Sequence, residues 1–99
     1  MILVTGTVQL PEGGLEKLLP AAKTMMDKTR KEDGCISYAY SQDLVDPSLM
    51  HVAEAWRDRE ALAAHFETPH MAVWRAAIRE VGLIDRNLKA HEADEGEVI

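Results

Sequence analysis

The sequence has a single cysteine, a shortage of basic residues and no long apolar run, and each shortage excludes a class of protein. One cysteine, Cys35, cannot form an internal disulfide, and the spacings typical of structural zinc sites are absent. No apolar run approaches the ~20 residues that a membrane-spanning helix requires. Neither the G-x-G-x-x-G pattern nor the P-loop occurs. We therefore predict no metal, no cofactor and no membrane partner.

The charge of the chain argues against a nucleic-acid partner. Its 11 Lys and Arg residues are outnumbered by 17 Asp and Glu, for a formal net charge of -6. Binding a phosphate backbone requires clustered basic residues, so no nucleic acid is expected. No basic segment precedes the apolar residues Met1 to Val4, so no signal peptide is predicted and we expect a cytoplasmic protein.

Apolar periodicity predicts seven elements within one domain that spans residues 1–99. Alternation indicates strands, and apolar spacings of three and four indicate helices. Pro20 falls inside the first helix, where it would remove a backbone donor or kink the chain. Residues 92–99 are expected to form a flexible acidic tail. The predicted elements are strand 2–10, a helix from residue 15 to a charged end at 28–33, strands 35–42 and 49–56, helices 58–66 and 68–82, and strand 83–91.

This order of elements is that of the ferredoxin-like split βαβ, an α+β fold. It places both helical regions on one face of a four-stranded antiparallel sheet. We expect the opposite face of the sheet to be apolar and therefore to need a cover. A second copy packed sheet to sheet is the simplest cover, so the sequence predicts a homodimer.

Four short segments carry a family resemblance. They are E-D-G-C-I-S-Y at 32–38, D-L-V-D-P at 43–47, E-A-W at 54–56 and A-H-F-E-T-P-H-M at 64–71. Together they resemble the antibiotic biosynthesis monooxygenase family of dimeric α/β barrels, most closely its small bacterial quinol monooxygenase branch. The resemblance implies a homodimer whose sheets face each other, with a pocket in each subunit between its sheet and helices. Family members include oxygenases that need neither metal nor flavin, and enzymes that degrade haem.

The haem-degrading branch fits poorly, because Thr5 and Thr7, His65 and Arg75 stand where that branch has Asn, Trp and His. The leading hypothesis is a cofactor-independent monooxygenase that oxidises a small phenolic, quinol or polyketide-like aromatic substrate with molecular oxygen. The alternative is a non-catalytic dimeric protein that binds a small ligand or assists a pathway.

The two histidines of the fourth segment are the candidates for proton transfer. His65 could act as the general base on a phenolic hydroxyl, or it could be a helix-end histidine that binds backbone carbonyls. His70, in the first turn of the next helix, could contact substrate or tie the loop together. Trp74 fits an apolar helical stripe, and Cys35 lacks a neighbouring base, so both are interpreted as packing residues.

The strands offer four further candidates for substrate binding. Trp56 could wall an aromatic substrate or anchor the core. Glu54 is unusual on an apolar strand face and must find a partner, for which Arg86 on the last strand is the candidate. Tyr38 and Tyr40 share a face with Ile36 in the alternation, and either phenol could bind a substrate oxygen or serve only in packing.

Overall fold

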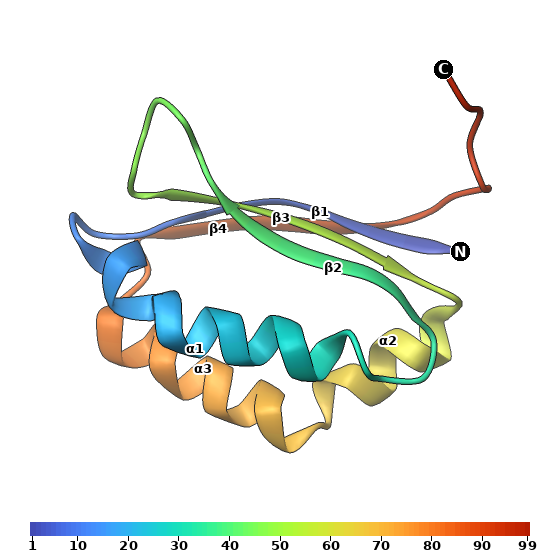
Figure 1. The fold of residues 1–99 in the computed structure, drawn as a ribbon, viewed down its shortest axis with the longest axis horizontal. Coiled ribbons are helices and arrows are strands. Elements are labelled where there is room, and N and C mark those ends of the chain that lie inside the picture. The colour runs from blue at the N-terminus through green and yellow to red at the C-terminus, as the bar shows by residue number, and fades with distance from the viewer.

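The computed structural model describes all 99 residues as two layers, with a sheet on one side and the helices on the other (Figure 1). The fold is ferredoxin-like α+β, as predicted. None of the helices is both long and apolar enough to cross a bilayer. The elements are β1 (Ile2–Gln9), α1 (Gly14–Thr29), β2 (Cys35–Gln42), β3 (Leu49–Trp56), α2 (Arg59–Phe66), α3 (Pro69–Val81) and β4 (Asp85–Glu92).

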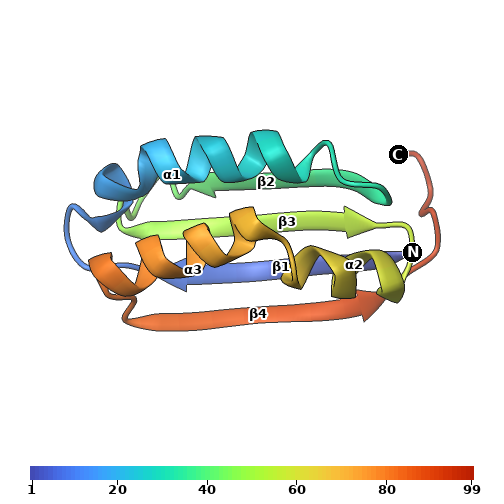
Figure 2. The same ribbon diagram turned by 90° about the horizontal axis from the view of Figure 1, so that it is seen from below.

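The four strands pair antiparallel in the order β2-β3-β1-β4, so the first strand of the chain lies inside the sheet. Figure 2 shows α1 running along the β2 side, while α2 and α3 follow one another over β1. The helix-facing side chains of the strands meet the apolar stripes of α1 and α3 in one core. The largest fully buried members of that core include Trp56, Leu10, Leu18, Met25 and Met50.

A bulge at Ile36 changes which side chains of β2 share a face. Cys35 pairs with Trp56, and Ser37 pairs with the preceding residue Ala55, so one residue of β2 is left over. Ile36 is therefore 57% exposed, whereas Tyr38 is buried. The expected common face of Ile36 with the two tyrosines was wrong, because simple alternation does not account for a bulge.

Pro20 lies inside α1 without interrupting it. A proline there cannot donate to the carbonyl of Glu16, four residues earlier. Both residues are exposed, so water can take the place of the missing donor. The exposure of Pro20 and Glu16 explains why α1 continues through a proline, a residue that destabilises a helix when it lies in a buried interior.

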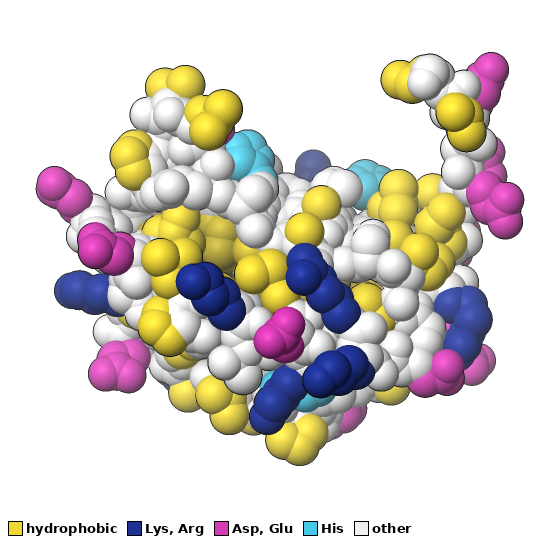
Figure 3. Space-filling view, in the orientation of Figure 1, with side chains coloured by type: hydrophobic (Ala, Val, Ile, Leu, Met, Phe, Trp, Pro, Cys, Tyr) yellow, Lys and Arg dark blue, Asp and Glu magenta, His cyan; other side chains and the backbone are white.

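The sheet face away from the helices is less apolar than expected. Its central strands β1 and β3 present small or polar side chains such as Thr5, Thr7, His51 and Ala53, with Leu3 and Leu49 among them. Two segments project past this open face in Figure 1, the turn between β2 and β3 and the chain after β4. Hydrophobic side chains are exposed on both segments in Figure 3, and they are Leu44, Val45, Val98 and Ile99.

Candidate active site

A cavity of about 510 Å³ lies between the sheet and the helices α2 and α3. Apolar side chains make up most of its wall, and a few polar groups converge on it, as is usual for small-molecule sites. Four of the residues predicted for the site line it: His65, Tyr38, Tyr40 and Glu54. Trp74, interpreted from the sequence as a packing residue, lines it as well.

Behind the cavity wall, one carboxylate is shared by two imidazoles. Glu32 Oε2 lies 2.7 Å from His65 Nδ1 and 2.8 Å from His70 Nε2. An ionised carboxylate can only accept, so each imidazole donates its N–H to Glu32. For His65 this fixes the proton on Nδ1 and leaves Nε2 as an acceptor. Because His65 lines the cavity and is only 1% exposed, that acceptor is available to a bound ligand rather than to bulk water.

Local structure brings these three residues together from separate elements. Glu32 follows α1, and Gly34 lets its loop approach α2 so closely that a Cβ there would lie 2.5 Å from that of Ala61. Asp58 caps α2 by accepting from the amide of Ala61 at 2.8 Å. Thr68 caps α3, and its hydroxyl donates to the carbonyl of His65 at 2.8 Å. These two caps and one glycine therefore position the imidazole.

Burial lowers the pKa of His65, and the hydrogen bond that His65 donates to Glu32 opposes that effect without cancelling it. The imidazole is therefore neutral at pH 7. A neutral imidazole with a free ring nitrogen is the state that a general base needs before it accepts a proton.

Glu54 provides a second titratable group on the cavity wall. Burial raises its pKa to about 7, and the indole of Trp56, which donates to Glu54 Oε1 at 2.9 Å, limits the rise. The pairing expected with Arg86 was wrong. Strand β1 lies between β3 and β4, and Val4 pairs with Glu54 whereas Arg86 pairs with Val8, further along the strand.

The two tyrosines form a phenol pair on the cavity wall. Their hydroxyls hydrogen-bond to each other, and burial raises the pKa of both phenols. One hydroxyl proton is used within the pair, so the other is free to donate to a ligand. The Tyr40 ring stacks on Trp74 with centroids 5.1 Å apart, and the edge of the Tyr38 ring packs near His65. Aromatic rings thus surround the space beside the imidazole.

Two residues predicted to bind substrate lie outside the cavity lining. Trp56 is fully buried behind Glu54, with its ring 4.7 Å from that of His65, a position that favours the core-anchor interpretation. His70 lies in a separate hollow against α1 and holds Glu32 from the far side. Any effect of these two residues on a ligand in the cavity therefore passes through Glu54, Glu32 or His65.

Glu32 was missed as a functional residue although its segment supplied part of the family resemblance. It follows a run of charged residues at a helix end, where a carboxylate is normally solvated. Its function depends on two histidines more than 30 positions away, and only the fold brings them together. The only sequence feature that marked Glu32 was its place two residues before Gly34 in the segment E-D-G-C-I-S-Y at 32–38.

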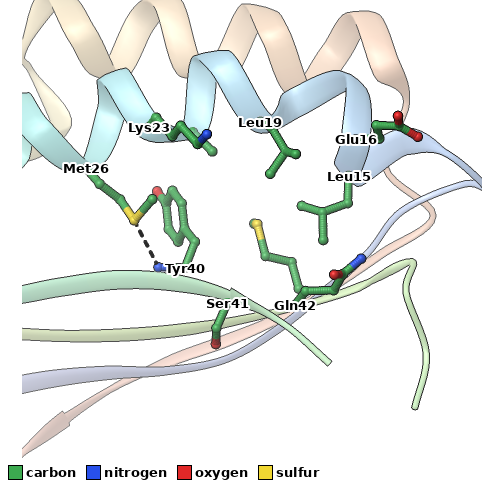
Figure 4. A pocket seen from close by; sticks show the side chains of 10 residues that line it. Leu15, Glu16, Leu19, Lys23, Met26, Tyr40, Ser41 and Gln42 are labelled. Carbon is green, nitrogen blue, oxygen red and sulfur yellow. Dashed lines mark hydrogen bonds between the residues drawn. The ribbon is translucent and has the colours of Figure 1, made fainter. Parts of the chain in front are cut away.

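A second cavity of about 380 Å³ opens between α1 and β2 (Figure 4). Leu15 and Leu19 reach into it from the helix, and the amide of Tyr40 donates to the sulfur of Met26 at 3.4 Å. Tyr40 and Met50 line both cavities, so these two side chains form the wall between them.

The donors of Glu32, His65 and His70 also form a set that could hold a divalent metal, since they all lie within 4.8 Å of one another. The two distances to Glu32 are those of direct N–H to carboxylate hydrogen bonds. Hydrogen bonding alone therefore accounts for the arrangement.

Comparison with known proteins places the chain in a family. The model of the antibiotic biosynthesis monooxygenase family matches residues 1–77. The chain belongs to that family. A candidate antibiotic biosynthesis monooxygenase from Deinococcus radiodurans superposes on this family member with a TM-score of 0.90 at 27% identity, over 100% of this chain and 98% of the other.

Two further relatives of this family member have no established activity. A conserved Bacteroides thetaiotaomicron protein, whose name suggests an oxidoreductase, has a TM-score of 0.81 at 30% identity over 93% of this chain and 96% of its own. An uncharacterized Synechocystis protein is 33% identical over 69 residues, which are 70% of this chain and 47% of that protein. The chain thus spans about half the length of the curated relative it matches.

Proposed function

We propose that this family member is a cofactor-independent monooxygenase that oxidises a small phenolic or quinol-type aromatic with molecular oxygen. The observation that carries the proposal is the neutral imidazole of His65, held by Glu32 on the wall of an aromatic-lined cavity. A carboxylate that orients an imidazole is a recurrent arrangement for a general base. Membership of the family and the oxidoreductase name of one relative support the reaction class.

The first step is removal of a phenolic proton by His65 Nε2. The resulting phenolate is electron-rich, and the positive charge formed on the imidazole is balanced by Glu32, 2.7 Å from Nδ1. A hydroxyl of the Tyr38–Tyr40 pair donates to a substrate oxygen, and Trp74 packs against the ring. These contacts hold the ring beside the base while the cavity excludes water.

A hydroquinol supplies all four electrons that one oxygen molecule requires. Two come from oxidation of the ring to the quinone and two from conversion of one ring C–H to C–OH. The phenolate passes an electron to oxygen, the two radicals join in a C–O bond, and the O–O bond then breaks. The second oxygen atom takes up two protons and leaves as water, so the products are a hydroxyquinone and water. No external reductant is needed.

The proposal is tested by oxygen uptake with a panel of hydroquinols, using protein dialysed against a chelator. We expect uptake above the rate without protein, with one hydroxyquinone formed per oxygen molecule consumed. His65→Ala should lower the turnover number by ~100-fold or more, the usual scale for loss of a general base. The matched control is His91→Ala, which removes an exposed imidazole that makes no hydrogen bond.

Two outcomes would overturn the proposal. One is uptake across the panel no faster than without protein. The other is loss of uptake on chelation with recovery when a divalent metal is added, because the Glu32 cluster would then act as a metal site. Tight binding of quinols without uptake would instead support the ligand-binding alternative.

A further inference from the structure

The charged side chains that line the large cavity are almost all of one sign. Arg59 of α2, Arg75 of α3 and Arg86 of β4 line it, against one carboxylate, that of Glu54. The whole chain shows the opposite balance, with 17 acidic and 11 basic residues. Three of the eleven basic residues therefore lie around one cavity of an acidic protein, where they create a local field that attracts anions.

Most of these cations have no carboxylate partner within the protein. Arg86 makes no side-chain hydrogen bond or ion pair, and Arg75 donates only to the carbonyl of Phe66 at 3.0 Å. Arg59 contacts Glu92 at 3.3 Å, but both side chains are largely exposed, so that pair is weak. The guanidinium groups of Arg75 and Arg86 are thus available to an incoming anion.

The cationic groups lie nearer the surface than the groups of the proposed chemistry. Arg75 and Arg86 are exposed and also line a neighbouring shallow hollow at the surface, whereas Tyr38 and His65 are buried. A ligand that fills the cavity would place one end against the buried phenol and imidazole. Its other end would reach the two arginines at the rim.

We propose that the aromatic ligand of this cavity carries a carboxylate, which Arg75 and Arg86 bind at the rim. The substrate class, which rests on the proposed function, is a hydroxylated aromatic acid whose ring hydroxyl lies at His65. A guanidinium binds a carboxylate through two parallel N–H donors, and two such groups at one rim select for that charge. The apolar wall would hold the ring but would not distinguish an acid from its ester.

The test measures binding without oxygen, so that it does not depend on turnover. The probes are gentisic acid, a hydroquinone with a ring carboxylate, and its uncharged methyl ester, titrated anaerobically by calorimetry. We expect the native protein to bind the acid at least tenfold more tightly than the ester. This preference should decrease as salt is raised from about 0.05 to about 0.5 M, because screening weakens exposed charge pairs.

Arg86→Gln is the decisive variant, since the Arg86 side chain makes no hydrogen bond or ion pair within the protein. It should reduce the preference for the acid to twofold or less while leaving the affinity for the ester unchanged. Arg75→Gln should act in the same direction. Lys17→Gln, an exposed residue of α1 that lines neither cavity, makes the same change in net charge and should keep the full preference.

Equal affinity of the native protein for acid and ester would overturn this proposal, as would an Arg86→Gln protein that keeps the full preference. Oxygen uptake with no preference for the acid would contradict carboxylate binding by Arg75 and Arg86 but not the proposed oxygenase activity. A clear preference for the acid without oxygen uptake would contradict the proposed oxygenase activity and support carboxylate binding by the two arginines.

Discussion

At the scale of single residues, the chemistry depends on how Glu32 constrains His65. In Glu32→Gln an amide replaces the carboxylate and can donate as well as accept, so the proton of His65 is no longer fixed on Nδ1. We expect the turnover number to fall by ~100-fold with little change in KM, because Glu32 itself does not line the cavity. Oxygen-uptake kinetics measure both quantities.

The control for that prediction is Glu67→Gln, a nearby exposed carboxylate without a side-chain partner. The control should keep full activity. A Glu32→Gln protein that loses affinity for quinols but keeps its turnover number would show that Glu32 has only a structural function.

Glu54 should make stability depend on pH. Its pKa is about 7 in the folded protein against an ordinary 4.5, so the folded state holds this proton more tightly than the unfolded state. The stabilisation is complete below pH 4.5 and is lost as the pH rises through 7, a change on the order of 3 kcal/mol. Glu54→Gln cannot lose a proton and still accepts from Trp56, so it should lack this decline.

Urea unfolding at pH 5 and pH 8 measures the effect as the difference between the native protein and Glu54→Gln. The pKa shift of His65 is common to both proteins and cancels from the difference. Glu97→Gln in the exposed C-terminal segment should behave like the native protein. Parallel stability curves for native protein and Glu54→Gln would contradict the raised pKa.

The sequence indicated candidate residues by their chemical type and could not indicate their partners. His65, Tyr38, Tyr40 and Glu54 were chosen as polar groups on apolar faces, and all four line the cavity. Glu32 was missed because its environment is created by residues distant in the chain. Whether each of these residues has the predicted role is still a prediction.

At the scale of elements, Gly6 sets how closely β4 can pair with β1. Its φ is +145°, and a Cβ there would lie 1.8 Å from the carbonyl oxygen of Asn87. Gly6→Ala must therefore displace β4, and we expect a loss of ~2–4 kcal/mol in the free energy of unfolding. Thermal and urea unfolding measure the loss.

Thr5→Ala is the matched control, since Thr5 is the exposed neighbour of Gly6 on the same strand and its change should cost much less. Because β4 carries Arg86, Gly6→Ala should also weaken binding of aromatic acids. Equal stability of the two variants would contradict the close approach of β1 and β4.

Apolar spacing located the helices closely, because this signal is local. Asp58 and Thr68 mark the starts of α2 and α3, as predicted from the sequence. The last strand begins at Asp85 rather than Leu83, and the bulge at Ile36 could not be predicted. Such deviations depend on strand pairing, which short-range patterns do not contain.

At the scale of the whole molecule, the homodimer predicted from the sequence still requires a test. The projecting segments end in exposed Leu44, Val45, Val98 and Ile99 beside the open face of the sheet, where a second copy could cover them. We expect light scattering to give twice the chain mass at micromolar concentration. Ala53→Glu, in the middle of the open face, should shift the protein toward monomer by burying a charge at the interface.

Ala76→Glu makes the same change at an exposed position of α3, on the helix side, and should keep the dimer. A native protein of single-chain mass at micromolar concentration would contradict the dimer.

The order of elements predicted the overall architecture because few topologies join these elements without crossing. The cavities were not predicted in detail, since they depend on how side chains fill the space between layers.

The shared carboxylate of Glu32 also affects how the molecule opens. It links the loop after α1 to the end of α2 and the start of α3, so none of these segments can move away without breaking bonds to the others. Hydrogen exchange should therefore give similar opening free energies for the amides of Cys35 and Thr68, which bond to the carbonyls of Glu32 and His65. The imidazole would then leave its working position only through a concerted fluctuation, and the site would be either fully assembled or fully open.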